Sequence, residues 1–116
     1  MAGDLKPIPL RFWRTSNGRE PVKEWLDEFG RDEQRVIGRD IGKLQYGWPV
    51  GLPLCRPLGG GLWEVRSTLP SKRESRVLFG FHEGMLITLH AFIKKSRKTP
   101  PEELALARSR MKELTP

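Results

Sequence analysis

A short stretch near the C-terminus, HAFIKKSRKTPPEE at residues 90–103, places a dense group of positive charges between an apolar run and two prolines. Its cations are Lys94, Lys95, Arg97 and Lys98. Arginine and lysine at this density bind phosphate oxygens, and a lysine crowded by other cations can also exchange a proton. His90 adds an imidazole, the usual proton-transfer group near neutral pH, although a lone histidine is more often structural. The stretch is therefore either an anion site or a solvated connector.

The segments before this stretch must position it, and three of them alternate between apolar and polar residues. Residues 62–69, 75–81 and 85–93 are predicted as strands on this pattern. The sequence HEG at residues 82–84 is predicted to join the last two strands as a tight antiparallel hairpin. The cationic stretch then lies just past the end of the last strand.

Because side chains alternate across a strand, each of these strands has a core face and an outer face. In the last strand the predicted core set is Met85, Ile87, Leu89, Ala91 and Ile93. Burying an unpaired cation is unfavourable by several kcal/mol, roughly, so the cationic sides are predicted to face outward. The outer face then groups Arg66, Arg76, His90, Phe92 and Lys94, with Glu64 as its acid; Lys95, Arg97 and Lys98 lie at its rim, and Arg73 lies in the turn before the second strand.

This outer face has the composition of a site for a phosphodiester backbone with bases stacking nearby. We therefore expect a catalytic role for Arg66, Arg76, Lys94, Lys95 and His90, and an RNA-binding role for Arg73, Phe92, Arg97 and Lys98. The alternative is a solvated sheet face, which antiparallel sheets often have.

The N-terminal half is predicted to hold a short strand at residues 9–14 and then two helices. Pro21 suits the first turn of one helix, and Asp32 is the predicted N-cap of the next. Gly38 and Gly42 lower helix propensity in the second helix, and we expect them to permit close packing against another element.

The remaining segments complete a β-α-α-β-β-β-α order. Residues 46–61 are rich in glycine and proline and are predicted to form a connector with a short strand near residues 54–58. Thr99 and Glu102 have the spacing of a capping box at the start of a final helix. The pattern predicts one α+β domain spanning residues 1–116.

Composition narrows the class of partner. The chain has a formal net charge of +7, and between Arg56 and Thr99 nine Lys or Arg face three Glu, which favours a polyanion such as nucleic acid. A single cysteine, Cys55, excludes an internal disulfide and fits a reducing cytoplasm. One cysteine and two histidines leave no zinc cage, and we expect no metal or cofactor. The sequence shows no signal peptide and no membrane span.

The segments LWEVR, RVLFGF and MLITLHAFIKKSRKTPPEELALARSR together resemble the RelE/ParE toxin superfamily, in particular its phage-derived HigB-like branch. The C-terminal half carries most of the likeness, and the run K-K-x-x-K-T-P is its most specific part. The resemblance implies a small RelE-like fold: a twisted antiparallel sheet, two N-terminal helices packed on one face, and a C-terminal helix.

The resemblance also implies a function. Members are toxins of type II toxin–antitoxin systems that cut mRNA, typically on the translating ribosome, and are neutralised by an antitoxin, usually a helix-turn-helix protein in the HigB branch. Carried over to this chain, Arg66, Arg76, Lys94 and Lys95 take the family's functional positions. Some relatives add a C-terminal tyrosine or histidine as acid or base, which this chain lacks after His90. A ParE-like inhibitor of DNA gyrase and a non-catalytic nucleic-acid-binding module remain as alternatives.

Overall fold

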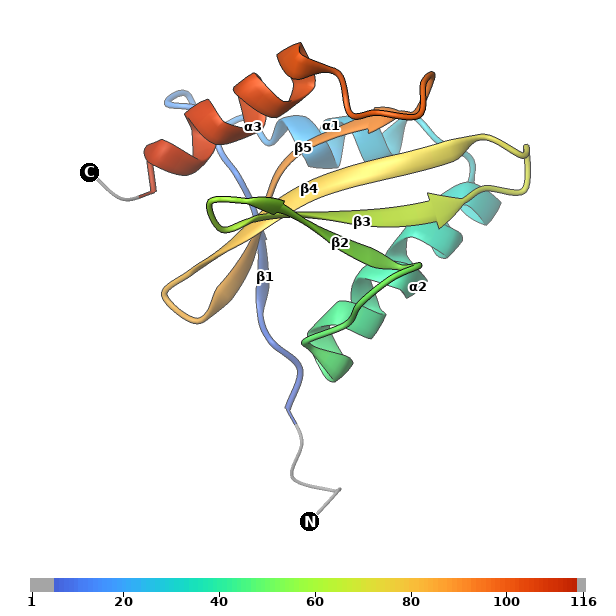
Figure 1. The fold of residues 1–116 in the computed structure, drawn as a ribbon, viewed down its shortest axis with the longest axis horizontal. Coiled ribbons are helices and arrows are strands. Elements are labelled where there is room, and N and C mark those ends of the chain that lie inside the picture. Colours follow the sequence, from blue (N-terminus) through green and yellow to red (C-terminus); the bar gives the residue numbers. More distant parts are fainter. Residues whose placement is uncertain (1–5, 115–116) are drawn as a thin grey trace.

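A five-stranded mixed sheet forms the centre of the fold, with strand order β1-β5-β4-β3-β2 (Figure 1). The computed structural model describes residues 6–114. Its strands are β1 (Leu10–Phe12), β2 (Cys55–Gly59), β3 (Leu62–Thr68), β4 (Glu74–His82) and β5 (Met85–Ile93). β2 to β5 form an antiparallel meander, whereas β1 lies parallel to β5. The sheet is therefore mixed, because the chain crosses from β1 through two helices to the far edge before it returns.

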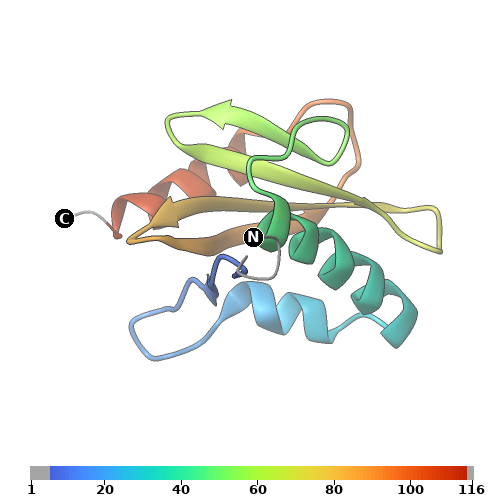
Figure 2. The ribbon, with the colours of Figure 1, turned by 90° about the horizontal axis from the view of Figure 1, so that it is seen from below.

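The helices cover both faces of this sheet. α1 (Pro21–Asp27) and α2 (Arg31–Gly47) lie on one face, and α3 (Pro101–Lys112) lies on the other (Figures 1 and 2). Pro21 begins α1 as predicted, because its missing N–H is not needed in the first turn. The N-cap of α2 is Gly30 rather than the predicted Asp32. Asp32 lies in the first turn, where its negative charge interacts favourably with the helix dipole. Within residues 6–114, no helix combines the length and apolarity that a membrane crossing requires.

The two faces of the sheet carry two separate apolar cores, whereas the strand pattern predicted one. The core under α1 and α2 contains Val22, Ile37, Leu44, Cys55, Val65, Val77, Phe79 and Leu86. The core under α3 contains Leu62, Leu78, Ile87, Leu89 and Ala107. The face predicted as the outer face is therefore buried over the part that α3 covers.

An irregularity in β5 explains why its predicted core set is wrong. Leu78 of β4 pairs with His90, but the next residue, Phe79, pairs with Thr88, so Leu89 is an extra residue in β5. Met85, Ile87 and Leu89 consequently face α3, whereas Ala91 and Ile93 pack with the other core. Arg110 of α3 donates to the carbonyl oxygen of Leu89 at 2.7 Å, which gives the bulged backbone a partner.

Glycines act at a few particular places in this fold. Gly84, with φ of 77°, forms the tight β4–β5 turn together with Glu83, as predicted. Gly80 lets α3 approach the sheet, because a Cβ at this position would lie 3.1 Å from the sulfur of Met111. Gly38 and Gly42 of α2 are different: a Cβ at either would meet nothing within 4 Å. The expectation that these two glycines permit close packing within the chain is therefore wrong.

Candidate anion-binding site at the end of the sheet

A buried carboxylate, Glu64, lies at the centre of the predicted site. Glu64 and Arg66 are two residues apart on β3 and so share a face, and Arg76 of β4 pairs directly opposite Arg66. The Oε1 atom of Glu64 lies 3.0 Å from Nε of Arg66 and 3.5 Å from Nε of Arg76. One carboxylate thus separates two guanidinium groups that would otherwise repel each other across the strands.

The two arginines have different environments. Arg76 is 4% exposed, so the prediction that its side chain faces outward is wrong. It is tolerated inside because Glu64, itself 1% exposed, balances its charge. Burial lowers the pKa of the Arg76 guanidinium from its ordinary value, against the opposing effect of Glu64. The Arg66 side chain is 28% exposed and is the arginine that a ligand can reach.

A second acid, Glu74, extends the cluster to the end of β5. Its Oε2 atom lies 3.3 Å from Nζ of Lys94, and the backbone N–H of Lys94 donates to the Glu74 carbonyl oxygen. Glu74 is also 4.0 Å from Nη1 of Arg76. Arg66, Arg76 and Lys94 are therefore brought together, as predicted, but through two carboxylates.

The connector between β5 and α3, residues 94–100, is hydrogen-bonded to Glu64. The hydroxyl of Thr99 donates to Oε2 of Glu64 at 2.9 Å. The predicted capping box is therefore wrong: α3 has Pro100 at its N-cap position and no side-chain cap. A buried carboxylate is a strong hydrogen-bond acceptor, so the Thr99 hydroxyl bonds to Glu64 rather than to the backbone at the helix end. The connector lies over a narrow crevice with no room for a water molecule, whose lining includes Phe92, Lys94, Arg97 and Lys98.

His90 lies on the same face, next to the start of α3. Its Nε2 atom is 3.2 Å from Oε1 of Glu103, and its ring stacks on Phe92 with centroids 5.9 Å apart. Its side chain is 16% exposed. His90 is thus held by neighbours on both sides and lies behind Phe92 as seen from the arginine cluster.

The rim cations separate into two groups. Lys95, Arg97 and Lys98 are exposed on the connector, and no carboxylate among residues 6–114 pairs with them. Arg73 lies elsewhere: it pairs with Glu33 of α2 at 3.0 Å and covers the Phe29 ring at 5.4 Å. The structure therefore separates Arg73 from the other predicted RNA-binding residues.

Residues 24–112 match the family of phage-derived Gp49-like proteins (DUF891). This chain belongs to that family. It is a RelE/toxin-like family of toxin–antitoxin systems, in agreement with the broader resemblance drawn from the sequence. No curated protein matches the chain. The matched range contains β2 to β5, the connector and α3. It also contains every member of the Glu64 cluster, which is formed by Glu64, Arg66, Glu74, Arg76, Lys94 and Thr99.

Sequence reasoning gave no role in the candidate site of this Gp49-like protein to three residues that contribute to it: Glu64, Glu74 and Thr99. One signal was available for Glu64. The predicted register sets Arg66 opposite Arg76, and like charges directly opposite each other are destabilising unless an acid lies between them. Glu64 was the acid predicted on that face.

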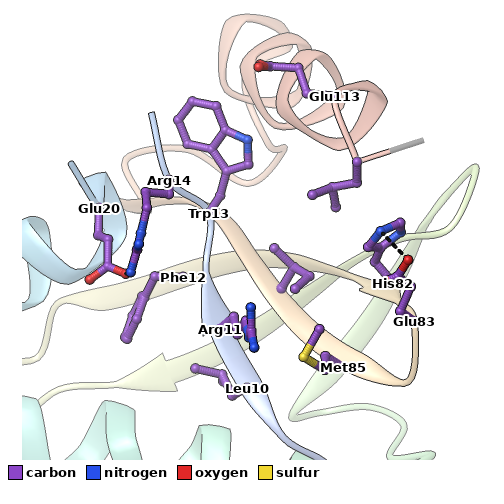
Figure 3. Close-up of a pocket in the computed structure, with 12 residues that line it drawn as sticks. Leu10, Arg11, Phe12, Trp13, Arg14, Glu20, His82, Glu83, Met85 and Glu113 are labelled. Carbon is purple, nitrogen blue, oxygen red and sulfur yellow. Dashed lines mark hydrogen bonds and ion pairs between the residues drawn. The ribbon is translucent and has the colours of Figure 1, made fainter. Parts of the chain in front are cut away.

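Another hollow in the described part of the Gp49-like protein lies at the opposite end of the sheet. It has a volume of about 750 Å³ and runs along the edge strand β1 toward the β4–β5 turn (Figure 3). Two pairs of side chains in its lining lie close together: Arg14 and Glu20 at 3.1 Å, and His82 and Glu83 at 3.7 Å (Figure 3). None of the predicted site residues lines it. This hollow and the candidate anion-binding site therefore lie in different parts of the described structure.

Proposed function

We propose that this Gp49-like protein is the toxin of a type II toxin–antitoxin system and that it cuts mRNA on the translating ribosome as a metal-independent endoribonuclease. One observation carries the proposal. A reachable arginine, Arg66, is held by a buried carboxylate beside a connector whose cations Lys95, Arg97 and Lys98 lie exposed. A solvated connector would not need such an anchor, whereas a phosphate site does.

The proposed reaction uses the RNA's own 2′-hydroxyl. That oxygen loses its proton to a base and attacks the adjacent phosphorus, and the 5′-oxygen leaves with a proton from an acid. The products are a 2′,3′-cyclic phosphate and a 5′-hydroxyl end. The protein must stabilise the extra negative charge on the phosphorane and carry the two protons.

Each candidate residue has a role that fits its place. The terminal nitrogens of Arg66 bind phosphate oxygens in a forked geometry, while Arg76 stays inside and balances Glu64. Lys94 and Lys95 stabilise the phosphorane and exchange protons. Phe92 offers a surface for a base, and the more distant cations Arg97 and Lys98 attract the backbone.

His90 is a second candidate for the proton-transfer group, besides Lys94 and Lys95. Its contact with Glu103 orients the ring, a pattern that suits a general base whose second nitrogen faces the reacting atoms. Phe92 stands between the ring and the arginines, so His90 acts only if bound RNA reaches past that side chain.

A toxin also needs a partner that restrains it. We propose a helix-turn-helix antitoxin that covers the Glu64 cluster and connector or keeps the toxin off the ribosome. In either case the complex should leave translation unaffected.

The test is to add the purified protein to translating ribosomes and map the mRNA ends. Cleavage that yields 5′-hydroxyl ends supports the proposal, and Arg66→Ala or the pair Lys94→Gln and Lys95→Gln should remove it. Arg14→Ala is a matched control, because Arg14 is 66% exposed at the other end of the sheet. A trapped gyrase–DNA complex with intact mRNA would instead indicate a ParE-like inhibitor, and neither outcome would indicate a binding module.

A further inference from the structure

Glu64 connects three separate parts of the chain through one side chain. It accepts from Arg66 on its own strand, pairs with Arg76 on β4 and accepts from Thr99 on the connector. The two carboxylate oxygens have different partners: Oε1 contacts both arginines, and Oε2 accepts the hydrogen bond from Thr99 of the connector. Glu64 itself is 1% exposed, so a bound RNA would contact its partners rather than Glu64.

The contact with Arg66 is made through Nε, which leaves the terminal nitrogens for other use. No acceptor among residues 6–114 engages Nη1 or Nη2 of Arg66. Arg76 differs, since its Nη1 also donates to the carbonyl oxygen of Ser75 at 3.3 Å. Glu64 therefore fixes the inner side of the Arg66 guanidinium and leaves its outer fork ready for a phosphate, so that less conformational entropy is lost on binding.

The contact with Thr99 sets the position of the connector. Lys94 at the start is held by Glu74, and Thr99 at the end is held by Glu64. The exposed cations Lys95, Arg97 and Lys98 lie between these two anchors. Glu64 thereby fixes the distance between the Arg66 fork and the connector cations, which must bind the same RNA backbone.

We propose that Glu64 is the positioning residue of the site: it aligns Arg66 with the connector cations, acts on cleavage through them, and does not itself touch RNA. This inference rests on the proposed nuclease function. The negative charge of Glu64 by itself would weaken the binding of an RNA phosphate, so its role here is to position the cations.

The opposing charge gives the experiment a clear sign. Glu64→Gln keeps the side-chain size and removes one negative charge, so RNA affinity should stay equal or rise. Cleavage at saturating RNA and ribosomes should fall, by about a hundredfold if the fork moves by roughly 1 Å. If the role of Glu64 were merely structural, Glu64→Gln should lower RNA affinity and cleavage rate together. Glu24→Gln is the matched control, because it makes the same charge change on α1, in an exposed pair with Arg19.

A second variant guards against simple unfolding. Thr99→Val removes the contact with Oε2 of Glu64 and leaves every charge in place. It should lower the unfolding midpoint modestly, because the buried Oε2 loses its donor, should slow cleavage by less than Glu64→Gln does, and should slow it no further in the Glu64→Gln background. If Glu64→Gln does not fold, the Thr99→Val result decides. Wild-type cleavage by folded Glu64→Gln, or by Thr99→Val, would overturn the proposal.

A readout that needs no cleavage separates this inference from the proposed function. Proton–nitrogen NMR should show slowly exchanging Nε–H signals for Arg66 and Arg76, assigned by Arg66→Lys and Arg76→Lys. The Arg66 signal, which reports the hydrogen bond to Glu64, should lose protection in Glu64→Gln. If wild-type protein left mRNA intact, the nuclease proposal would be wrong. If the Nε–H signals were nevertheless protected, Glu64 would hold the arginines in place without any role in cleavage. Unprotected Nε–H signals in wild type would refute the Glu64 alignment even if mRNA were cut.

Discussion

Replacing Arg76 with alanine tests whether the buried ion pair supports the fold. In Arg76→Ala, Glu64 would keep Arg66 and Thr99 but would lack the partner that is buried with it. Breaking a buried pair typically destabilises by about 3–5 kcal/mol, and the two remaining contacts place this case near 3 kcal/mol, roughly. For a domain of this size, that change lowers Tm by about 10 °C.

Arg66→Ala provides the comparison within the same cluster. The Arg66 side chain is 28% exposed, and its removal leaves Glu64 paired with Arg76, so we expect destabilisation of about 1 kcal/mol or less. The two variants thus divide the arginine pair. Arg66→Ala should abolish RNA cleavage with a stable fold, whereas Arg76→Ala should reduce stability itself.

Urea unfolding followed by tryptophan fluorescence measures both variants. Trp48 and Trp63 pack edge to face at 4.8 Å and report on the core under α2. Equal unfolding midpoints for Arg76→Ala and Arg66→Ala would refute the assignment of Arg76 to the interior. Replacing both Glu64 and Arg76 with leucine should recover most of the stability, because a matched apolar pair removes the unpaired charge.

Other expectations concern the connector, the packing of α3 and the cysteine. Replacing Arg97 and Lys98 with glutamine should weaken RNA binding and flatten its salt dependence by about one unit of slope for each phosphate that the protein no longer neutralises; an unchanged slope would show that neither residue meets phosphate. Gly80→Val should destabilise by about 1–3 kcal/mol in urea unfolding, because its Cβ meets the Met111 sulfur, and Met111→Ala should relieve part of this effect. Burial raises the pKa of Cys55 to about 11, so native protein should resist iodoacetamide at pH 8 and react after unfolding; rapid native labelling would contradict the buried position.

The sequence predicted the elements of this fold because their signals are local. Pro21 at a helix start, the Glu83–Gly84 turn and the alternation in β3 and β4 each depend on a few neighbouring residues. The bulge at Leu89 has no such signal, since every residue around it in β5 is compatible with a regular strand. One extra residue then reversed the face of Met85, Ile87 and Leu89, and the second core under α3 was missed with it.

The sequence predicted which cations share a face in the candidate site, but it did not predict how deeply each of them is buried. Alternation placed Arg66, Arg76 and Lys94 on one face, and the structure agrees. Whether that face meets solvent depends on where α3 and the connector lie, which is a tertiary property. The Thr99 capping box failed for the same reason, because Glu64 offers its hydroxyl an acceptor that is distant in sequence.

The pairing of β1 with β5 has a consequence for synthesis of the chain. Leu10 pairs with Leu86, so most of the protein must be made before the first strand finds its neighbour. At about 5–20 residues per second, β1 waits several seconds in an emerging chain, and such non-local pairing also folds slowly. The connector and α3 follow later still, and the connector supplies Thr99, which joins it to Glu64. A chain whose synthesis has not yet passed Thr99 therefore lacks the contact between the connector and Glu64.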